Sequence, residues 1–238
     1  MVLSRERCQF VKGGIAVGVW LLPAVLLLAA CAGTRTSPTP TSSPNWTPAS
    51  PRTVDQLAAA VAQDAARNDH ETDAKAREAL AEDASRNADA CLAEDPHAAA
   101  CLYYHGIALG LGARAHPLHA VDSLKAMVEA LTSAEAADPQ YDHAGPSRVR
   151  ALVLTRAPGW PIGPGDPDAA LVAARRAVSL DPGFPPNVLA LAEAQAKTGD
   201  GEGARQSYAH ARDLAQSLPP STDRDDWLSQ ANKALQHN

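Results

Sequence analysis

The sequence predicts an all-α solenoid built from helical hairpins. Three Asp-Pro pairs, at 95–96, 138–139 and 181–182, lie 43 residues apart, and each closes an alanine-rich run. A fixed period in this range is typical of stacked supersecondary units. No stretch of the sequence alternates between apolar and polar residues for long enough to predict a strand. We therefore expect a surface that holds partners and no catalytic pocket.

Residues 1–31 have the features of a bacterial lipoprotein signal peptide. Three basic residues come first, residues 13–30 are uncharged and almost wholly apolar, and small residues precede Cys31. The alternative is a single membrane-spanning helix. At about 1.5 Å per residue the apolar run reaches only ~27 Å, short of a ~30 Å hydrocarbon core. We therefore expect cleavage before Cys31 and acylation of that cysteine.

A spacer rich in proline, serine and threonine follows over residues 32–53, and the folded domain is expected over residues 54–238. Removal of residues 1–31 lowers Lys+Arg from 21 to 18 and Asp+Glu from 27 to 26, so the mature net charge is −8. Negative charge repels phosphate backbones and gives no polybasic attraction to anionic lipid. We expect no nucleic-acid partner, and attachment to the membrane through the acyl chains.

The helices are predicted in order from caps and apolar faces. Thr53 is placed to cap the first helix, Asp166 and Pro167 begin a later one, and Thr222 is placed to cap a terminal helix that closes the stack. The helix over residues 98–111 is apolar on two sides, as a middle layer requires. The other apolar faces at helical spacing are Leu57, Val61 and Ala65; Leu80, Ala84, Ala88 and Cys91; Val121, Leu124, Met127 and Leu131; Val149, Leu152 and Val153; Ala170, Ala174 and Val178; Val188, Leu191 and Ala192; Ala204, Tyr208 and Ala211; Trp227, Leu228 and Ala231.

Two cysteines, Cys91 and Cys101, belong to the predicted folded domain. They flank the Asp-Pro turn at 95–96, one near the end of a helix and one near the start of the next. Export to an oxidising compartment permits a disulfide between them. The alternative is a pair of small buried thiols that pack like alanine. The Cα separation decides between the two, and the sequence leaves both open.

The last two units place small, aromatic and proline residues at fixed spacing. The positions are Ala170, Ala177 and Pro182, then Ala192, Ala204, Tyr208 and Ala211. These units resemble tetratricopeptide repeats, a family that places small residues where the two helices of a hairpin cross, an aromatic four residues after an alanine of the second helix, and a proline at the close. The period is 43 instead of the usual 34, so about nine residues are inserted in the first two units. We expect the insertions between the helices of a hairpin, at 112–117 and 157–165, and the tryptophan usual near the start of the first helix is absent.

A narrower pattern covers about residues 145–215. Its segments are Arg-Ala-Pro-Gly-Trp-Pro at 156–161, Gly-Pro-Gly-Asp at 163–166, Ala-Arg-Arg-Ala at 174–177, Phe-Pro-Pro-Asn at 184–187 and Leu-Ala-Glu-Ala at 191–194. Together they resemble the TatT family. TatT proteins are the tetratricopeptide-like lipoprotein components associated with TRAP transporters. The resemblance implies a homo-oligomer on the periplasmic side that meets a substrate-binding protein of the transporter, and an apolar small ligand is a further expectation.

Five residues are candidates for binding a ligand or partner. We expect Trp160 to fold back and fill a gap between helices, and the alternative is that it lines a groove or contacts a partner. Tyr103 and Tyr104 point about 100° apart, so at most one faces a groove. His105 is expected in the core or a groove. Asn187 is expected to cap a helix, and the resemblance implies a second role in fixing the loop that carries Trp160.

These observations predict a non-enzymatic, exported, lipid-anchored binding protein. The sequence contains no phosphate loop, nucleophile elbow or zinc-protease helix, so we expect no cofactor, no metal and no catalysis. The alternative function is a general envelope scaffold for outer-membrane or pilus assembly. Because Ala32, not aspartate, follows the lipid cysteine, the enterobacterial sorting rule predicts the outer membrane, facing the periplasm.

Overall fold

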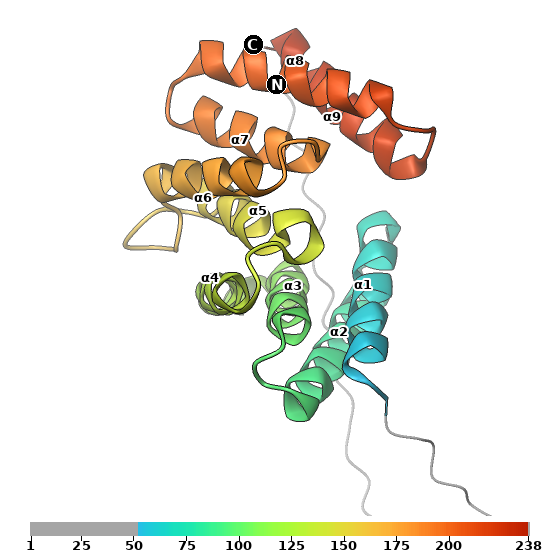
Figure 1. The fold of residues 1–238 in the computed structure, drawn as a ribbon. Coiled ribbons are helices and arrows are strands. Elements are labelled where there is room, and N and C mark those ends of the chain that lie inside the picture. The colour runs from blue at the N-terminus through green and yellow to red at the C-terminus, as the bar shows by residue number, and fades with distance from the viewer. Residues whose placement is uncertain (1–51, 238) are drawn as a thin grey trace, which may run out of the picture. The chain divides into compact units, whose positions relative to one another are not determined.

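The computed structural model describes residues 52–237, and in this part of the chain it confirms an all-α fold (Figure 1). The predicted signal peptide and residues 32–51 of the predicted spacer lie outside the described residues. Nine α-helices and one short 3-10 helix follow one another in residues 52–237. They are α1 Val54–His70, α2 Ala74–Glu94, α3 Ala99–Ala115, η1 Pro117–His119, α4 Ala120–Ala137, α5 Tyr141–Arg156, α6 Pro167–Leu180, α7 Pro185–Lys197, α8 Gly201–Ser217 and α9 Thr222–His237.

Four antiparallel hairpins stack on one another, and α9 covers the last of them. The hairpins are α1 with α2, α3 with α4, α5 with α6 and α7 with α8. Each odd-numbered helix also contacts the next odd-numbered helix, whereas within the described residues no even-numbered helix contacts another. The odd-numbered helices therefore form a continuous inner layer (Figure 1). The ends of α1, α3 and α5, each of which leads into a turn within a hairpin, line one groove and so mark an edge of this layer. We call this edge the hairpin-turn edge.

The three Asp-Pro pairs are three copies of the same turn between hairpins. Asp95, Asp138 and Asp181 end α2, α4 and α6 with extended backbones, at φ of −147°, −150° and −141°. Proline disfavours a helical conformation in the residue before it, which stops each helix there. Each aspartate Oδ1 also accepts a hydrogen bond from the backbone N–H two residues later. The 43-residue period is thus the spacing at which this turn recurs, once after each of the first three hairpins.

Alanine is the most frequent residue of the buried core in residues 52–237. Ala84 and Ala88 in α2, and Ala170 and Ala174 in α6, have no exposed surface. Small side chains at these crossings let the helix backbones approach closely, and this explains why the sequence can build a stack with few large apolar residues. None of the helices in the described residues is long and apolar enough to cross a bilayer.

The predicted caps are confirmed at two of three positions. Thr53 Oγ1 accepts from the Gln56 N–H, and Asp166 accepts from two N–H groups in the first turn of α6. The Thr222 cap was wrong by one residue, because Ser221 Oγ accepts from the Arg224 N–H and Thr222 is already helical. The insertion expected at 112–117 was also partly wrong, since most of it lengthens α3 and only its end enters the turn.

The structure joins Cys91 and Cys101 by a disulfide. Cys91 lies in the last turn of α2 and Cys101 in the first turn of α3, and their Cα atoms are 5.2 Å apart. Both cysteines are fully buried. The bond therefore fastens the first hairpin to the second across the first Asp-Pro turn.

Candidate functional site

The start of α5 is a left-handed turn that the sequence did not predict. Asp142, His143 and Ala144 have φ of 48°, 56° and 60°. For residues with a Cβ this conformation costs roughly 1–2 kcal/mol each, so it persists only where surrounding contacts fix it. The right-handed helix begins after this turn, and Pro146 stands in its first turn, where the missing N–H is tolerated.

Arg148 fixes this turn from inside the protein. Only 8% of the residue is exposed. Its Nη1 donates to the carbonyl oxygens of Asp142 and His143, both at 3.1 Å, and its Nη2 donates to Asp142 Oδ2 at 2.9 Å. Tyr103 OH donates to the same carboxylate oxygen at 2.7 Å. The turn thus receives hydrogen bonds from its own helix and from α3.

Asn187 completes the network from α7. Its Nδ2 donates to the carbonyl oxygens of His143, Ala177 and Asp181 at 3.0, 3.3 and 2.9 Å, and its Oδ1 accepts from Arg148 Nη1 at 3.3 Å. The predicted capping role was wrong, because Asn187 lies inside α7 and is fully buried. We call Tyr103, Asp142, Arg148 and Asn187 the polar joint, since they connect the second, third and fourth hairpins.

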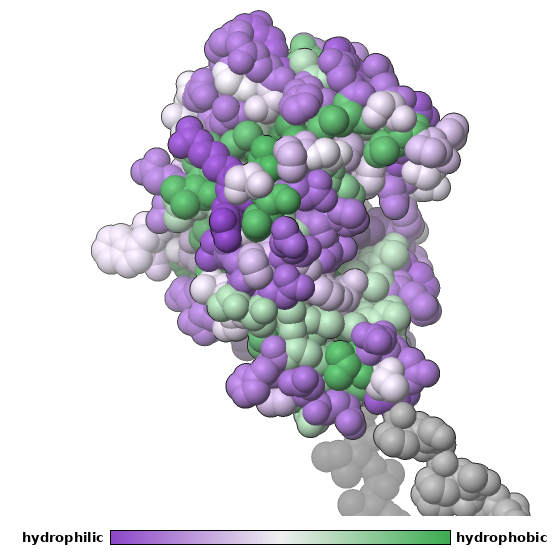
Figure 2. All heavy atoms as spheres, in the orientation of Figure 1, coloured by the Kyte–Doolittle hydropathy of each residue, from purple (hydrophilic) through white to green (hydrophobic). Residues whose placement is uncertain are grey.

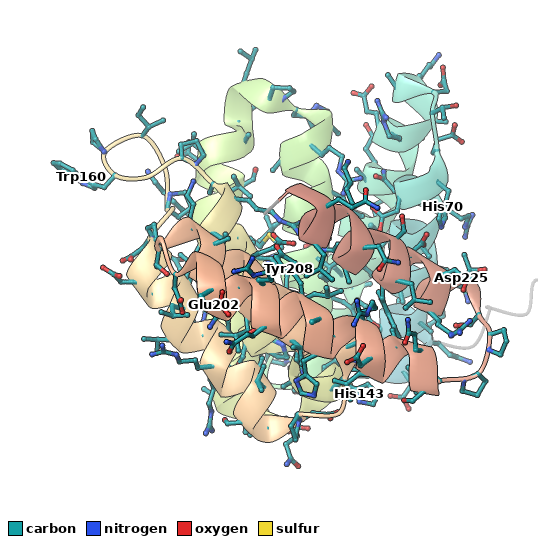
Figure 3. The ribbon with its side chains drawn as sticks, turned by 90° about the horizontal axis from the view of Figure 1, so that it is seen from above. His70, His143, Trp160, Glu202, Tyr208 and Asp225 are labelled. Atoms are coloured by element: carbon teal, nitrogen blue, oxygen red, sulfur yellow. A yellow bond between two sulfur atoms is a disulfide. The ribbon has the colours of Figure 1, made fainter. Side chains whose placement is uncertain are left out.

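Aromatic side chains cover the outer side of the polar joint. The His143 ring, labelled in Figure 3, stacks on Phe184 with 4.3 Å between ring centroids, and its Nδ1 lies 2.8 Å from Asp181 Oδ2. Trp227 of α9 meets Phe184 edge-on at 5.5 Å. The guanidinium of Arg148 lies 5.1 Å from the centroid of the same ring. These contacts extend the joint to the closing helix.

Three tyrosines form a cluster beside the polar joint. Tyr103, Tyr104 and Tyr141 pack edge-on, with centroids 5.1 to 6.4 Å apart. Burial raises the pKa of Tyr103 well above its usual value, with Asp142 adding to the rise and Arg148 opposing it. Burial also raises the pKa values of Tyr104 and Tyr141. The phenols therefore stay neutral at physiological pH and act in packing and hydrogen bonding. Tyr103 is the core residue of the predicted pair, and Tyr104 is half-buried.

A groove with a volume of about 560 Å³ lies along the inner layer near the hairpin-turn edge. Helices α1, α3, α4 and α5 line it, together with Ala157 and Pro158 after α5. Its apolar lining includes Ile107, Leu124, Met127 and Leu152. We call it the edge groove. It has the size and lining of a site for an apolar segment or small molecule.

The charges around the edge groove are already paired. Arg114 Nη1 lies 3.1 Å from Asp69 Oδ1. Arg156 forms a two-point contact with Glu193, from Nε at 2.8 Å and from Nη2 at 2.6 Å. Gln230 of α9 donates to the same carboxylate at 2.8 Å. The groove therefore offers an apolar floor between neutralised ion pairs, and this favours an uncharged occupant.

Trp160 lies outside the groove, and the prediction that it fills a gap between helices was wrong. Its residue is 90% exposed, at the tip of the loop between α5 and α6. In Figure 3 the labelled side chain points away from the helices, and in Figure 2 this loop stands clear of the body on the left. Neither the role of filling the interior nor the predicted link to Asn187 is present, because the side-chain partners recorded for Asn187 lie in α5, α6 and the turn after α6.

The five candidate residues do not form one site. Tyr103 and Asn187 meet through the polar joint, and Tyr104 packs on Tyr103. His105 instead lies on the other side of α3, with Nδ1 3.8 Å from Asp89 Oδ1 of α2. No group of three or more metal-ligating side chains occurs in residues 52–237.

Two important residues were missed from the sequence, Asp142 and Arg148. The sequence did contain a signal for them. In the third hairpin, extra residues separate the Asp-Pro turn from the regular helix, and this segment ends in Gly145-Pro146. A proline there indicates that a regular helix starts late, and the preceding residues need another conformation.

The fold and these sites define an all-α protein of tetratricopeptide type. A family model described as a tetratricopeptide repeat matches residues 162–220, which span α6, α7 and α8. A thermophilic TPR protein of Thermus thermophilus is similar in structure, with a TM-score of 0.52 and 20% sequence identity over 77% of this chain and 92% of that chain. At this identity the likeness shows the fold alone.

A second solved structure, of MamA protein, has a TM-score of 0.44 and 18% identity, and the match covers 71% of this chain and 88% of that chain. The fold assignment does not rest on it. No curated protein matches the sequence.

Proposed function

We propose that this chain is an exported, lipid-anchored docking protein that binds an envelope protein through the edge groove and performs no chemistry on it. The single observation that carries the proposal is the edge groove itself, an apolar channel of about 560 Å³ on the inner layer of a tetratricopeptide-type stack. Helical repeats use such surfaces to bind extended or helical segments of partners.

The lining of the edge groove supports binding in preference to catalysis. Its charged neighbours Arg114 and Arg156 are held by Asp69 and Glu193. An active site would require titratable groups that converge on a reacting atom. A partner segment with apolar side chains would bury the lining without leaving a charge unpaired.

The TatT-like segments between residues 156 and 194 suggest the identity of the partner. They support a substrate-binding protein of a TRAP-type transporter, met on the periplasmic side. Anchoring at Cys31 and sorting to the outer membrane belong to the same proposal. An apolar small ligand in the groove is a finer version of it.

Site-specific photo-crosslinking in the native envelope tests the docking surface. A photoreactive amino acid replaces Leu152, which lines the edge groove, and in a control replaces Val172, which is 67% exposed on α6 and is not among the groove residues. We expect the probe at Leu152 to capture a periplasmic substrate-binding protein and the probe at Val172 to capture none. Capture of outer-membrane or pilus assembly proteins from Leu152 would instead support the general envelope scaffold. Equal capture from both positions would rule out docking in the groove.

The anchor has a separate test. Metabolic labelling with radioactive palmitate is expected to label the wild-type protein and to leave Cys31→Ser unlabelled. Labelling of both would contradict acylation at Cys31.

A further inference from the structure

The loop between α5 and α6 exposes a large uncharged apolar tip. Residues 157–165 contain no charged side chain. Within them Trp160 is 90% exposed and Ile162 is 66% exposed. Exposed large apolar side chains that are clustered, not scattered, mark sites of interaction. We call Trp160 and Ile162 the loop tip.

The loop is internally bonded, so the exposure of its tip is built into the fold. The N–H groups of Ile162 and Gly163 donate to Gly159 O, at 3.0 and 3.1 Å, and the Gly165 N–H donates to Pro158 O at 2.8 Å. The Asp166 N–H donates back to Leu154 O in α5 at 3.0 Å. The loop therefore holds Trp160 outward at a fixed place.

A third exposed apolar residue belongs to the same edge. Leu118 is 97% exposed in η1, the turn within the second hairpin, and the loop tip occupies the turn within the third. The ends of α3 and α5, which lead into these two turns, line the same edge groove. The turns of two neighbouring hairpins thus each expose a large apolar side chain.

We infer that the loop tip inserts into the interfacial layer of the membrane that holds the lipid anchor. This inference rests on the anchoring in the proposed function. Tryptophan favours the boundary between headgroups and acyl chains, because its ring is apolar and its indole N–H still meets water. A tip without charges enters this layer without stripping water from an ion.

A lipid surface suits the loop tip better than a protein partner does. The side chains that dominate protein interfaces are ringed by neighbouring contacts that exclude water. Here one ring and one isoleucine protrude on a narrow loop, a geometry suited to a soft layer. The charges that flank the loop in sequence, on Arg156, Asp166 and Asp168, are exposed at its base and would stay at the level of the headgroups. The mature protein is also acidic, so insertion should not require anionic lipid.

The spacer is long enough to allow this contact. An extended proline-rich chain covers about 3.1 Å per residue, so residues 32–53 reach up to ~70 Å. By comparison, a helix of the domain such as α1 is only ~26 Å long at about 1.5 Å per residue, so the reach of the spacer exceeds the length of a helix. Anchoring keeps the domain close to the bilayer, at an effective concentration in the millimolar range, so weak insertion suffices. The result would be to turn the hairpin-turn edge, and the end of the edge groove beside it, toward the membrane.

Depth-dependent fluorescence quenching tests the inference with the full lipidated chain in phosphatidylcholine vesicles. Brominated lipids quench tryptophans that lie at the depth of the bromine. Of the four tryptophans of the sequence, Trp20 lies in the predicted signal peptide, so the lipidated chain keeps Trp46, Trp160 and Trp227. The signal of Trp160 is therefore the difference between wild type and Trp160→Phe. We expect brominated lipid to reduce that difference signal at least twofold, with no further reduction when anionic lipid is added.

The matched control moves the tryptophan to an equally accessible site on another face. In a Trp160→Phe background, Val172→Trp places an indole on α6 at a position that is 67% exposed. We expect no quenching of that indole. Quenching of Val172→Trp as strong as that of Trp160, or no quenching of Trp160, would overturn insertion of the loop tip.

Flotation of the vesicles separates failure of the anchor from failure of the inference. A wild-type protein that does not float, or a Cys31→Ser protein that floats equally well, contradicts the anchor. A wild-type protein that floats while Trp160 stays unquenched contradicts the inference alone. A photoreactive residue at position 160 adds a direct readout: adducts to lipid support insertion, and adducts to protein without lipid adducts overturn it.

Discussion

Arg148 Nη1 donates a hydrogen bond to Asn187 Oδ1 across 3.3 Å, at the place where the third hairpin meets the fourth. The two residues are 39 positions apart in sequence, and both are buried. Arg148 holds the left-handed turn from one side, and Asn187 holds the same turn from the other side through His143 O. This pair turns a costly backbone conformation into a fixed joint between the third and fourth hairpins.

Replacement of Asn187 by alanine should destabilise the protein strongly. The change removes the four hydrogen bonds of a fully buried side chain. His143 O and Ala177 O keep donors in Arg148 Nη1 and the Asp181 N–H, whereas Asp181 O and the Arg148 guanidinium each lose a partner. Unsatisfied buried groups cost roughly 1–3 kcal/mol each, more when charged, and water entry recovers part of this. We expect Asn187→Ala to lower the free energy of unfolding by about 2–4 kcal/mol, as measured by urea denaturation.

The control is Asn232→Ala, an exposed asparagine on α9. That substitution should change the free energy of unfolding by no more than about 0.5 kcal/mol. Similar losses in both variants would contradict the role of the polar joint.

The buried tyrosines should make the protein sensitive to alkaline pH. Burial raises the pKa values of Tyr103, Tyr104 and Tyr141 in the folded state. Above about pH 10 the unfolded chain therefore loses phenol protons that the folded chain keeps. The unfolded state then binds fewer protons, so the stability is fully present below pH 10 and falls as the pH rises toward the folded-state pKa values.

Tyr103→Phe tests this assignment. It removes the hydrogen bond to Asp142 and should cost about 1 kcal/mol at neutral pH. It also removes one of the retained protons, so the loss of stability between pH 10 and 11 should be smaller by up to about 1.4 kcal/mol per pH unit. Urea denaturation at pH 8, 10 and 11 supplies both numbers. Parallel pH profiles for the variant and the wild type would show that Tyr103 ionises normally.

The parts of the fold that were predictable from sequence depend on local interactions. The aspartate before each proline ends a helix through its own backbone and carboxylate, within three residues. The caps at Thr53 and Asp166 also act within one turn. Because these signals involve neighbours in the chain, a pattern of residue types is sufficient to find them.

The polar joint and the exposure of Trp160 depend on distant contacts or on loop geometry. The φ angles of Asp142, His143 and Ala144 are fixed by hydrogen bonds from Arg148 and Asn187. No local sequence pattern predicts that these two residues bind the same turn. Trp160 was expected to pack inside because large aromatic rings usually do. The backbone hydrogen bonds across its loop instead hold Trp160 outward. These bonds depend on the backbone conformation of the loop, which the composition of the loop does not specify.

The Cys91–Cys101 disulfide should stabilise the first two hairpins. It closes a short loop, with a sequence separation of 10, between helices that already pack together. Closure of a loop of this length removes freedom from the unfolded chain worth about 2–3 kcal/mol. We therefore expect reduction to lower the urea midpoint, measured on samples whose free thiols are counted by mass spectrometry after alkylation.

The double variant Cys91→Ala, Cys101→Ala is the matched control. Its urea midpoint should lie below that of the oxidised wild type and should not respond to reductant. A wild-type midpoint that stays unchanged when both thiols are shown to be free would contradict stabilisation by the disulfide.

Gly165 should be essential to the shape of the loop that carries Trp160. A Cβ at this position would collide with Ala157 O and lie 2.8 Å from Pro158 O, and both are backbone atoms that cannot turn aside. Gly165→Ala should therefore open the loop and break the hydrogen bond from Gly165 N–H to Pro158 O. We expect faster hydrogen exchange over residues 157–166 and a loss of about 1–3 kcal/mol in the free energy of unfolding.

The control is Gly112→Ala, in the helical part of α3, where a Cβ meets nothing within 4 Å. This substitution should raise the free energy of unfolding by up to about 1 kcal/mol. If Gly165→Ala keeps wild-type exchange in the loop, the close packing at Gly165 does not determine the path of the loop that carries Trp160.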